Sequence, residues 1–552
     1  MSGFRLWREP DEEVRELPSL LLHSAHHYLR VMISSLRFFN RFRLGSVRPE
    51  GLHSARSRRA CRSLVHLISP LVMLAGALAA EQPAGETLRL HPDNPRYFLW
   101  RGKATALITS AEHYGAVINP DFDYRKYLAA LAADGMNYTR IFVGSYVEKP
   151  GAFGILRNTL APESGRFLAP WARSSAPGYA GGGNKFDLDQ WNTDFFQRLR
   201  DFVAEADRRG IAVEITLFCS IYNDLGWSIS PFNPANHVND EPLADWKKLH
   251  TLDNGGILAR QEALTRKIVR ELNGAENIFY EIQNEPWADQ HTIGDPINPY
   301  LMKERKFPNV VEITAPASVA WQTLVAAWIA DAEAELPRKH LIAQNISNFR
   351  LPVRESDVAP GVSILNFHYA YPEAVSWNSG LRKLIGYDET GFAGRADETY
   401  RRDAWAFVLA GGGLYNNLDY SFHVGAEQGI GPEPEAPGGG SAALRRQLRV
   451  LADFIHSFDL GELTPDLNVV RNSPGVVTRA LSRPGKEYGI PATGRGPCRL
   501  SLGLPDGTYS AEWLDTANGR ILKPEDFTSK GGAHDLQSPE FTNEIALRVK
   551  LK

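Results

Sequence analysis

Two glutamates stand where apolar segments end, and they are the residues of this sequence best suited to chemistry. Glu285 follows the apolar run 278–282 and precedes Pro286, which cannot continue a strand. Glu389 ends a second apolar run that begins at Leu384. A carboxyl group beside an apolar wall keeps its proton and acts as an acid, whereas a carboxylate acts as a base or nucleophile. Two such groups facing each other can share the cleavage of one bond.

The elements that carry these glutamates are typical of parallel strands. The run 278–282 consists of strand formers and follows a helical pattern, as in a buried parallel strand. The two glutamates are 389 − 285 = 104 residues apart, which leaves room for about three β/α units. In a (β/α)₈ barrel the carboxyl ends of all strands meet at one rim, so we expect both glutamates there.

Strands alternate with helices along residues 88–460, which predicts a (β/α)₈ TIM barrel. The connections 144–186 and 288–316 show no clear periodicity, and we expect long loops there. Residues 464–552 change to short alternating strands, which predicts a small all-β sandwich domain. The eight expected barrel strands are 104–110, 136–142, 211–218, the one built on the apolar run 278–282, 340–346, 362–369, 384–391 and 414–421.

The barrel segment resembles the retaining glycoside hydrolases of clan A, especially family 5 (cellulase-like) and its relatives. The resemblance covers about residues 88–460 and rests on Asn284-Glu285, on Glu389, and on a Gly-x-Asn-x-x-Arg element that ends at Arg140. It implies an O-glycosyl hydrolase that works by double displacement, with Glu285 as acid/base and Glu389 as nucleophile. The implied partner is an oligo- or polysaccharide substrate, and no cofactor is implied.

Further residues are candidates for holding the substrate. The resemblance places Arg140 near the nucleophile, where its charge favours an ionised carboxylate. Asn284 is suited to donate a hydrogen bond to the sugar 2-hydroxyl. His113 and Tyr114, at the end of the first strand, are candidate sugar contacts, with simple packing as the alternative. Trp287 lies in a rim loop, where an exposed aromatic ring can stack on a sugar.

The sixth strand departs from the family pattern. His368 matches the histidine that family 5 carries there, but Ala370 stands where the family usually has a tyrosine. Tyr369 and Tyr371 flank Ala370, and either of them could reach the nucleophile. The resemblance therefore leaves the substrate-binding tyrosine open.

Two other rim positions also differ from the family. Phe218-Cys219-Ser220 follows the third strand, where the family often has a histidine. Ser421-Phe422-His423 follows the eighth strand, where the family has a tryptophan that forms a sugar platform. These differences leave the catalytic assignment standing and leave the sugar unspecified.

Two other classes of protein fit parts of the sequence. A non-catalytic carbohydrate-binding or adhesion protein could use a glycosidase-like barrel, but Glu285 and Glu389 each keep their flanking pattern. A metal-dependent barrel hydrolase would need a ligand cluster, but no His-x-His follows the first strand. The cysteines Cys219 and Cys498 have no zinc-type spacing, and we expect no metal site and two free thiols, with one disulfide as the alternative.

Charge is distributed unevenly along the 552 residues. The formal net charge is −3, while residues 1–80 carry 12 arginines against 6 acids, which leaves about −9 for the rest. The part beyond residue 80 has no basic patch, which argues against a nucleic-acid partner.

The amino-terminal region contains a segment typical of a secretory signal peptide at 58–80. Arginines precede the apolar stretch 64–78, and Ala77-Leu78-Ala79 forms a cleavage site. We expect a secreted or periplasmic protein with no stable membrane span after cleavage. The extension 1–57 is explained by a start codon placed too early or by a cytoplasmic segment with a membrane anchor through 64–78.

The carboxy-terminal segment shows a second resemblance. Gly507-x-Tyr509 and Trp513-x-Asp515 are similar to the β-domain that follows the barrel in many such glycosidases, a domain type named for collagen binding. We expect a domain that buttresses the barrel.

Overall fold

The structure, a computed structural model, describes residues 87–296, 310–431 and 436–552. The expected extension 1–57, the signal peptide 58–80 and the possible anchor 64–78 lie outside these residues. Among the residues described, no helix combines the length and the apolar character needed to cross a membrane.

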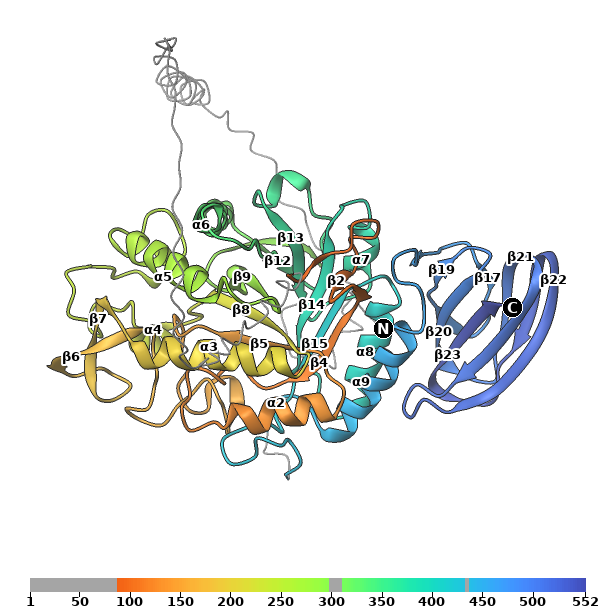
Figure 1. The fold of residues 1–552 in the computed structure, drawn as a ribbon, viewed down its shortest axis with the longest axis horizontal. Coiled ribbons are helices and arrows are strands. Elements are labelled where there is room, and N and C mark those ends of the chain that lie inside the picture. The colour runs from red at the N-terminus through yellow and green to blue at the C-terminus, as the bar shows by residue number, and fades with distance from the viewer. Residues whose placement is uncertain (1–86, 297–309, 432–435) are drawn as a thin grey trace, which may run out of the picture. The chain divides into compact units, whose positions relative to one another are not determined.

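Eight parallel strands form a nearly closed barrel, which confirms the predicted (β/α)₈ fold (Figure 1). Their order is β4-β15-β14-β13-β12-β9-β8-β5, and each neighbouring pair is parallel. The apolar runs found in the sequence are buried here on both faces, as expected of strands covered by helices. The barrel strands are β4 (Leu107–Ala111), β5 (Tyr138–Phe142), β8 (Ala212–Cys219), β9 (Ile278–Asn284), β12 (Ile342–Asn348), β13 (Val362–His368), β14 (Leu384–Thr390) and β15 (Leu414–Leu418).

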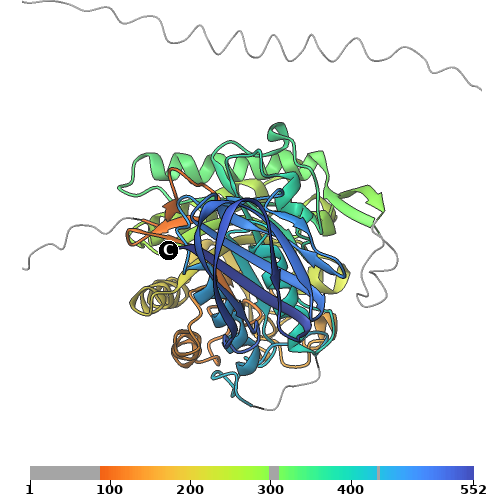
Figure 2. The same ribbon diagram turned by 90° about the vertical axis from the view of Figure 1, so that its right-hand side faces the viewer.

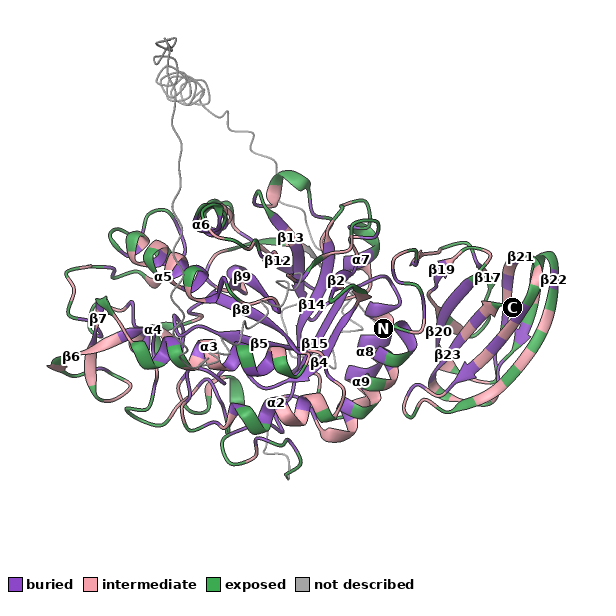
Figure 3. Cartoon of the chain, in the orientation of Figure 1, coloured by how far each residue is buried: buried purple, intermediate pink, exposed green. Residues whose placement is uncertain are grey.

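The helices bury one face each and leave the other exposed (Figure 3). In α3, for example, the buried Phe195, Leu199 and Phe202 recur at helical spacing, and Asn192 caps the first turn by accepting backbone N–H groups. The helices are α2 (Tyr124–Ala133), α3 (Thr193–Arg208), α4 (Asp224–Ile229), α5 (Ile257–Leu272), α6 (Pro316–Ala334), α7 (Glu373–Trp377), α8 (Asp397–Val408) and α9 (Ala442–Ile455).

A small antiparallel sheet covers the amino-terminal end of the barrel. It consists of β1 (Arg89–Leu90), β2 (Phe98–Trp100) and β3 (Lys103–Thr105). Phe98 packs on Phe279 near the start of β9, with ring centroids 5.9 Å apart. This end of the barrel is therefore filled with apolar side chains, and the polar residues are left for the opposite rim.

Two connections expected as loops contain hairpins, so that prediction is wrong for parts of 144–186 and 288–316. The second hairpin also joins the barrel sheet, because Ile313 pairs with Ser347 of β12 in antiparallel register. The first strand of each hairpin ends in a proline, Pro177 or Pro296, and the pairing of Ile313 with Ser347 joins residues far apart in the sequence, so local periodicity does not reveal these strands. The hairpins are β6 (Trp171–Pro177) with β7 (Asn184–Trp191), and β10 (His291–Pro296) with β11 (Val310–Thr314).

Antiparallel strands alone follow α9, which confirms the predicted all-β domain (Figure 2, blue). Its core is apolar and includes the fully buried Trp513 and Tyr509. Contacts connect it to the barrel: Arg401 of α8 pairs with Glu544. The strands are β16 (Thr464–Pro465), β17 (Val470–Asn472), β18 (Val476–Thr478), β19 (Leu481–Arg483), β20 (Glu487–Arg495), β21 (Arg499–Leu514), β22 (Ile521–Gln537) and β23 (Thr542–Leu551).

Candidate active site

Glu285 and Glu389 line the same cavity of about 320 Å³. Glu285 directly follows β9, and Glu389 is the second-to-last residue of β14. Both therefore lie at the carboxyl ends of parallel strands. Active sites of this fold lie at that end. The cavity is lined by His113, Tyr114, Phe142, Glu148, Phe153, Leu160, Cys219, Tyr222, Asn284, Glu285, Trp287, Ala288, Glu312, Asn348, Tyr369, Glu389 and Phe392.

The two carboxyl groups lie close together. A carboxylate oxygen of Glu285 is within 4.8 Å of one from Glu389, and His368 Nδ1 lies 3.0 Å from Glu285 Oε1 and 3.6 Å from Glu389 Oε1. Retaining glycosidases hold their two carboxyl groups about 5–5.5 Å apart, whereas inverting enzymes need about 6.5–9.5 Å for an intervening water. The nearest carboxylate oxygens of Glu285 and Glu389 thus lie within the shorter of these two spacings.

The backbone is strained around this cavity. Glu285 has φ 48° and ψ 53°, a left-handed conformation that non-glycine residues seldom adopt. Of the nine non-glycine residues with positive φ in the described part of the chain, six line the cavity. Such strain concentrates where function demands a particular side-chain direction. The six residues are Tyr114, Phe153, Tyr222, Glu285, Tyr369 and Phe392.

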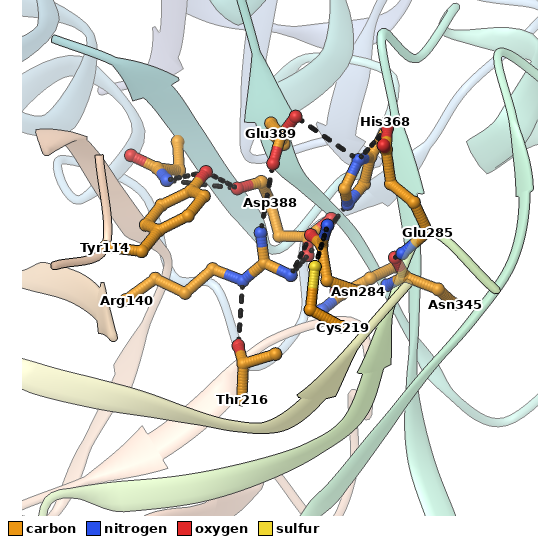
Figure 4. Close-up of polar contacts among 12 residues, drawn as sticks. Tyr114, Arg140, Thr216, Cys219, Asn284, Glu285, Asn345, His368, Asp388 and Glu389 are labelled. Atoms are coloured by element: carbon orange, nitrogen blue, oxygen red, sulfur yellow. Dashed lines mark hydrogen bonds and ion pairs between the residues drawn. The ribbon is translucent and has the colours of Figure 1, made fainter. Parts of the chain in front are cut away.

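Glu389 is buried, and Figure 4 shows its contacts with Arg140 and His368. Arg140 Nη1 lies 3.3 Å from its Oε2, and the Tyr369 hydroxyl donates to its Oε1 at 2.8 Å. Burial raises the pKa of Glu389 above its ordinary value, and the charge on Glu285 adds to the rise. His368 and Arg140 act in the opposite direction. The expected stabilising role of Arg140 is thus present as a contact, but burial outweighs it in the net direction.

Arg140 is fully buried beneath the cavity and binds several acids at once (Figure 4). Its guanidinium pairs with Glu281 and lies 3.3 Å from Asp388 Oδ2. Burial opposes ionisation of Asp388, but His368 and Arg140 lower its pKa to about 2. Burial raises the pKa of Glu281 to about 7. Asp388 is therefore the ionised neighbour of Arg140, and Glu281 exchanges its proton near neutral pH.

A directed series of hydrogen bonds connects Arg140 to Glu285. Arg140 Nη2 donates to Asn284 Oδ1 at 2.8 Å, and Asn284 Nδ2 donates to the Tyr222 hydroxyl at 2.8 Å. That hydroxyl donates to Glu285 Oε2 at 2.8 Å. Asn284 lines the cavity as predicted for a sugar contact, and these bonds fix the orientation of its amide.

His368 lies between the two glutamates and the buried acids. Its Nδ1 is 3.0 Å from Glu285 Oε1, and its Nε2 is 3.4 Å from Asp388 Oδ2. Burial opposes a charge on this ring, but Glu389 and Asp388 raise the pKa of His368 well above its ordinary value. A protonated His368 can donate from Nδ1 to Glu285 and holds that carboxyl group in place, while among the described residues its Nε2 makes only an ion-pair contact with Asp388.

The two candidate tyrosines of the sixth strand have different surroundings. Tyr369 lines the cavity and bonds to Glu389. Tyr371 is not among the lining residues, and its ring stacks on Phe349 with centroids 5.8 Å apart. The hydrogen bond to the nucleophile candidate comes from Tyr369.

The remaining candidates, His113, Tyr114 and Trp287, all line the cavity. His113 Nε2 lies 3.4 Å from Glu148, while its buried Nδ1 has no hydrogen-bond partner among the described residues. Tyr114 lies over the guanidinium of Arg140 at 4.7 Å. Trp287 is only 3% exposed and packs edge-on against His368, so its ring supports that side chain.

Two sets of side chains in the described part of the chain have the spacing to hold a metal ion: Glu281 with His368 and Asp388, and Glu285 with His368 and Glu389. His368 belongs to both sets, and a protonated imidazole has no lone pair to offer a metal. Since these groups already bond to one another, the arrangement favours hydrogen bonding over coordination. Cys219 and Cys498 are unpaired thiols, as expected.

Sequence reasoning missed Tyr222, Asp388, Glu148 and Glu312. Tyr222 follows Phe218-Cys219-Ser220, where the family histidine is absent, and its left-handed backbone directs it to Glu285. The register of β14 shifts between Tyr387 and Thr390, and the adjacent Asp388 and Glu389 both reach Arg140. No local signal in the sequence marks either feature.

Comparisons with known proteins show the same fold and little sequence similarity. No family model matches the chain, and no curated protein matches it. A solved glycoside hydrolase has a TM-score of 0.55 at 13% identity, covering 85% of this chain and 97% of its own. A glycoside hydrolase family 5 structure from Bacteroides vulgatus has a TM-score of 0.55 at 13% identity, covering 84% and 93%. At this identity the similarity shows the fold alone.

Proposed function

We propose that the protein is a retaining glycoside hydrolase that cleaves O-glycosidic bonds with Glu389 as nucleophile and Glu285 as acid/base. The observation that carries the proposal is the pair of carboxyl groups within 4.8 Å across one cavity at the carboxyl end of the barrel. The shared fold with solved glycoside hydrolases and the family-like motifs around both residues support it.

In the first step, an oxygen of Glu389 attacks the anomeric carbon while Glu285 gives its proton to the leaving oxygen. The bond to the leaving group breaks as the ester to Glu389 forms. Arg140 and Tyr369 hold the attacking carboxylate in position through contacts of 3.3 and 2.8 Å. Both groups also stabilise the carboxylate that is released again later.

In the second step, Glu285 is a carboxylate and takes a proton from water, whose oxygen attacks the same carbon. Glu389 then leaves as a carboxylate, and the sugar keeps its anomeric configuration. The Tyr222 hydroxyl donates to Glu285 Oε2, and His368 Nδ1 lies 3.0 Å from Glu285 Oε1, so these contacts hold the carboxyl group in position through both steps.

The test uses two variants with different predicted kinetics. Glu389→Ala should abolish hydrolysis of any glycoside, because no ester can form. Glu285→Ala should still cleave aryl glycosides with good leaving groups, should stall at the second step, and should be rescued by azide, which needs no general base. The assay measures release of the aryl group and identifies the glycosyl azide.

A wild-type protein that releases no sugar from a broad panel of aryl glycosides and polysaccharides, yet binds some of them, would favour the carbohydrate-binding alternative. Retained hydrolysis in Glu389→Ala would contradict the assignment of the nucleophile.

For the carboxy-terminal domain we propose a supporting role in place of binding collagen. Its contacts with the barrel include the ion pair between Arg401 and Glu544 and the 3.1 Å hydrogen bond from Arg548 Nη1 to Ser457 Oγ. None of the residues that line the catalytic cavity comes from it.

A further inference from the structure

A row of aromatic rings leads from the floor of the catalytic cavity to its mouth. The centroid distances are 5.1 Å from Tyr114 to Phe142 and 6.0 Å from Phe142 to Tyr146. They continue with 6.0 Å from Tyr146 to Tyr222 and 5.1 Å from Tyr222 to Phe153. Phe153 ends the row in a short helical turn of a loop, with 44% of its surface exposed.

A second cavity of about 230 Å³ adjoins the catalytic one. The two cavities share Glu148, Phe153 and Tyr222, so the edge-on pair of Phe153 and Tyr222 forms the wall between them. Its volume is below the roughly 300 Å³ at which sites for drug-sized ligands begin. The second cavity therefore suits one ring-sized unit of a ligand whose remaining part lies in the catalytic cavity.

The walls of this cavity combine the two surfaces that a sugar requires. One face of a sugar ring presents C–H groups and packs on an aromatic ring such as Phe153, while its hydroxyls need polar partners. Glu148 provides a carboxylate whose position is fixed by the Tyr146 hydroxyl, which donates to it at 3.1 Å, and by Asn158. A fixed acceptor beside an exposed ring selects a polyhydroxylated ring over a purely apolar one.

The shared wall also indicates on which side of the cleaved bond the second cavity lies. Tyr222 donates to Glu285 Oε2 at 2.8 Å, and Glu285 is the group proposed to protonate the leaving oxygen. The hydrogen-bond and ion-pair partners described for Glu389 are Arg140, Tyr369 and His368, none of which lines the second cavity. The second cavity therefore lies on the side of Glu285, which protonates the leaving group, and not on the side of the nucleophile Glu389.

We propose that the second cavity is a sugar-binding subsite for the leaving group, with Phe153 as its stacking surface. The inference rests on the proposed function and extends it, because it makes the substrate a chain with sugar units on both sides of the cleaved bond. Glycosides with small leaving groups do not reach this subsite and make no contact with Phe153 there.

The test compares substrates that reach the subsite with substrates that do not. The probes are β-glucosyl, β-mannosyl and β-galactosyl fluorides, whose leaving group is a fluoride ion, and β-linked di- and trisaccharides of the same sugars. For wild type, Phe153→Ala and Phe153→Tyr, the measured quantity is the ratio of kcat/KM for oligosaccharide to kcat/KM for fluoride. Leu156→Ala is the matched control, because Leu156 is on the same loop, is 61% exposed and lines neither cavity.

Phe153→Ala should lower this ratio about fivefold, in line with the ~1 kcal/mol typical of one aromatic contact. Phe153→Tyr, which keeps the ring, should restore it, and Leu156→Ala should leave it at the wild-type value. Since Phe153 is largely exposed and every replacement meets the same positive φ, loss of folding does not explain such a pattern.

An unchanged ratio in Phe153→Ala would overturn the proposed subsite, and so would an equal fall of the ratio in Leu156→Ala. In either case, hydrolysis of a glycosyl fluoride by wild type would leave the proposed function intact. If wild type turns over a fluoride and Glu389→Ala does so equally well, the proposed function fails and the subsite with it.

Discussion

Replacing Tyr369 by Phe removes one hydrogen bond from Glu389 and changes little else. The Tyr369 hydroxyl donates to Glu389 Oε1 at 2.8 Å, and the side chain is 6% exposed. Phe fills nearly the same volume, and among the described residues Glu389 Oε1 keeps only the contact with His368 Nδ1 at 3.6 Å. Arg140 still contacts the other oxygen at 3.3 Å. The substitution therefore isolates the contribution of a single donor to the charged form of the nucleophile.

The size of the effect follows from that hydrogen bond. A hydrogen bond to a charged group contributes ~1.5–3 kcal/mol, and 1.36 kcal/mol corresponds to about one pH unit in the titration of the group. The Tyr369 hydroxyl lowers the pKa of Glu389, so its removal raises that pKa further above the ordinary value. Since attack requires the ionised carboxylate, the acidic limb of the activity profile should move to higher pH by about one to two pH units.

The assay is kcat/KM for an aryl glycoside as a function of pH, measured for wild type, Tyr369→Phe and Tyr371→Phe. Tyr371 lies two residues further along, outside the lining of the cavity, and its loss should leave the acidic limb in place. An acidic limb that does not move in Tyr369→Phe, or that moves equally in both variants, would refute the reasoning about Glu389.

Three further predictions concern stability, metals and export. The pKa of Glu281 is raised to about 7 by burial, so its contribution to stability is complete below the ordinary carboxyl pKa and is lost as pH rises toward 7. The unfolding temperature of Glu281→Gln should therefore rise relative to that of wild type as the pH increases between these two values. A constant difference between the two unfolding temperatures over this pH range would contradict the prediction. Activity should survive dialysis against a chelator, because His368 is engaged as a hydrogen-bond donor; a loss that Mg²⁺ or Zn²⁺ restores would place a metal in the site. The mature protein from its native host should begin close to Ala79, and mass spectrometry that finds an intact amino terminus in the cytoplasm would disprove export.

The barrel and its two glutamates were predictable because their signals are local. Each barrel strand is a short apolar run between breakers, and Pro286 marks the point at which the central strand stops. The carboxyl ends of parallel strands share one rim, so Glu285 and Glu389 had to lie on the same side.

The parts that escaped prediction depend on contacts between distant residues. Strand β11 exists as part of the barrel sheet because Ile313 pairs with Ser347, and neither residue signals this by itself. Tyr222 reaches Glu285 through a left-handed backbone at φ 66° that its own sequence does not require. The choice between Tyr369 and Tyr371 likewise depends on where the chain turns after β13. Local periodicity carries no information on such turns.

The stereochemistry of the first-formed product tests the central claim most directly. Carboxylate oxygens of Glu285 and Glu389 lie within 4.8 Å of each other, and the proposed reaction therefore passes through an ester on Glu389. Proton NMR during hydrolysis of an aryl glycoside should show a first product with the anomeric configuration of the substrate, before mutarotation. A first product of inverted configuration would contradict the account even if both glutamates proved essential.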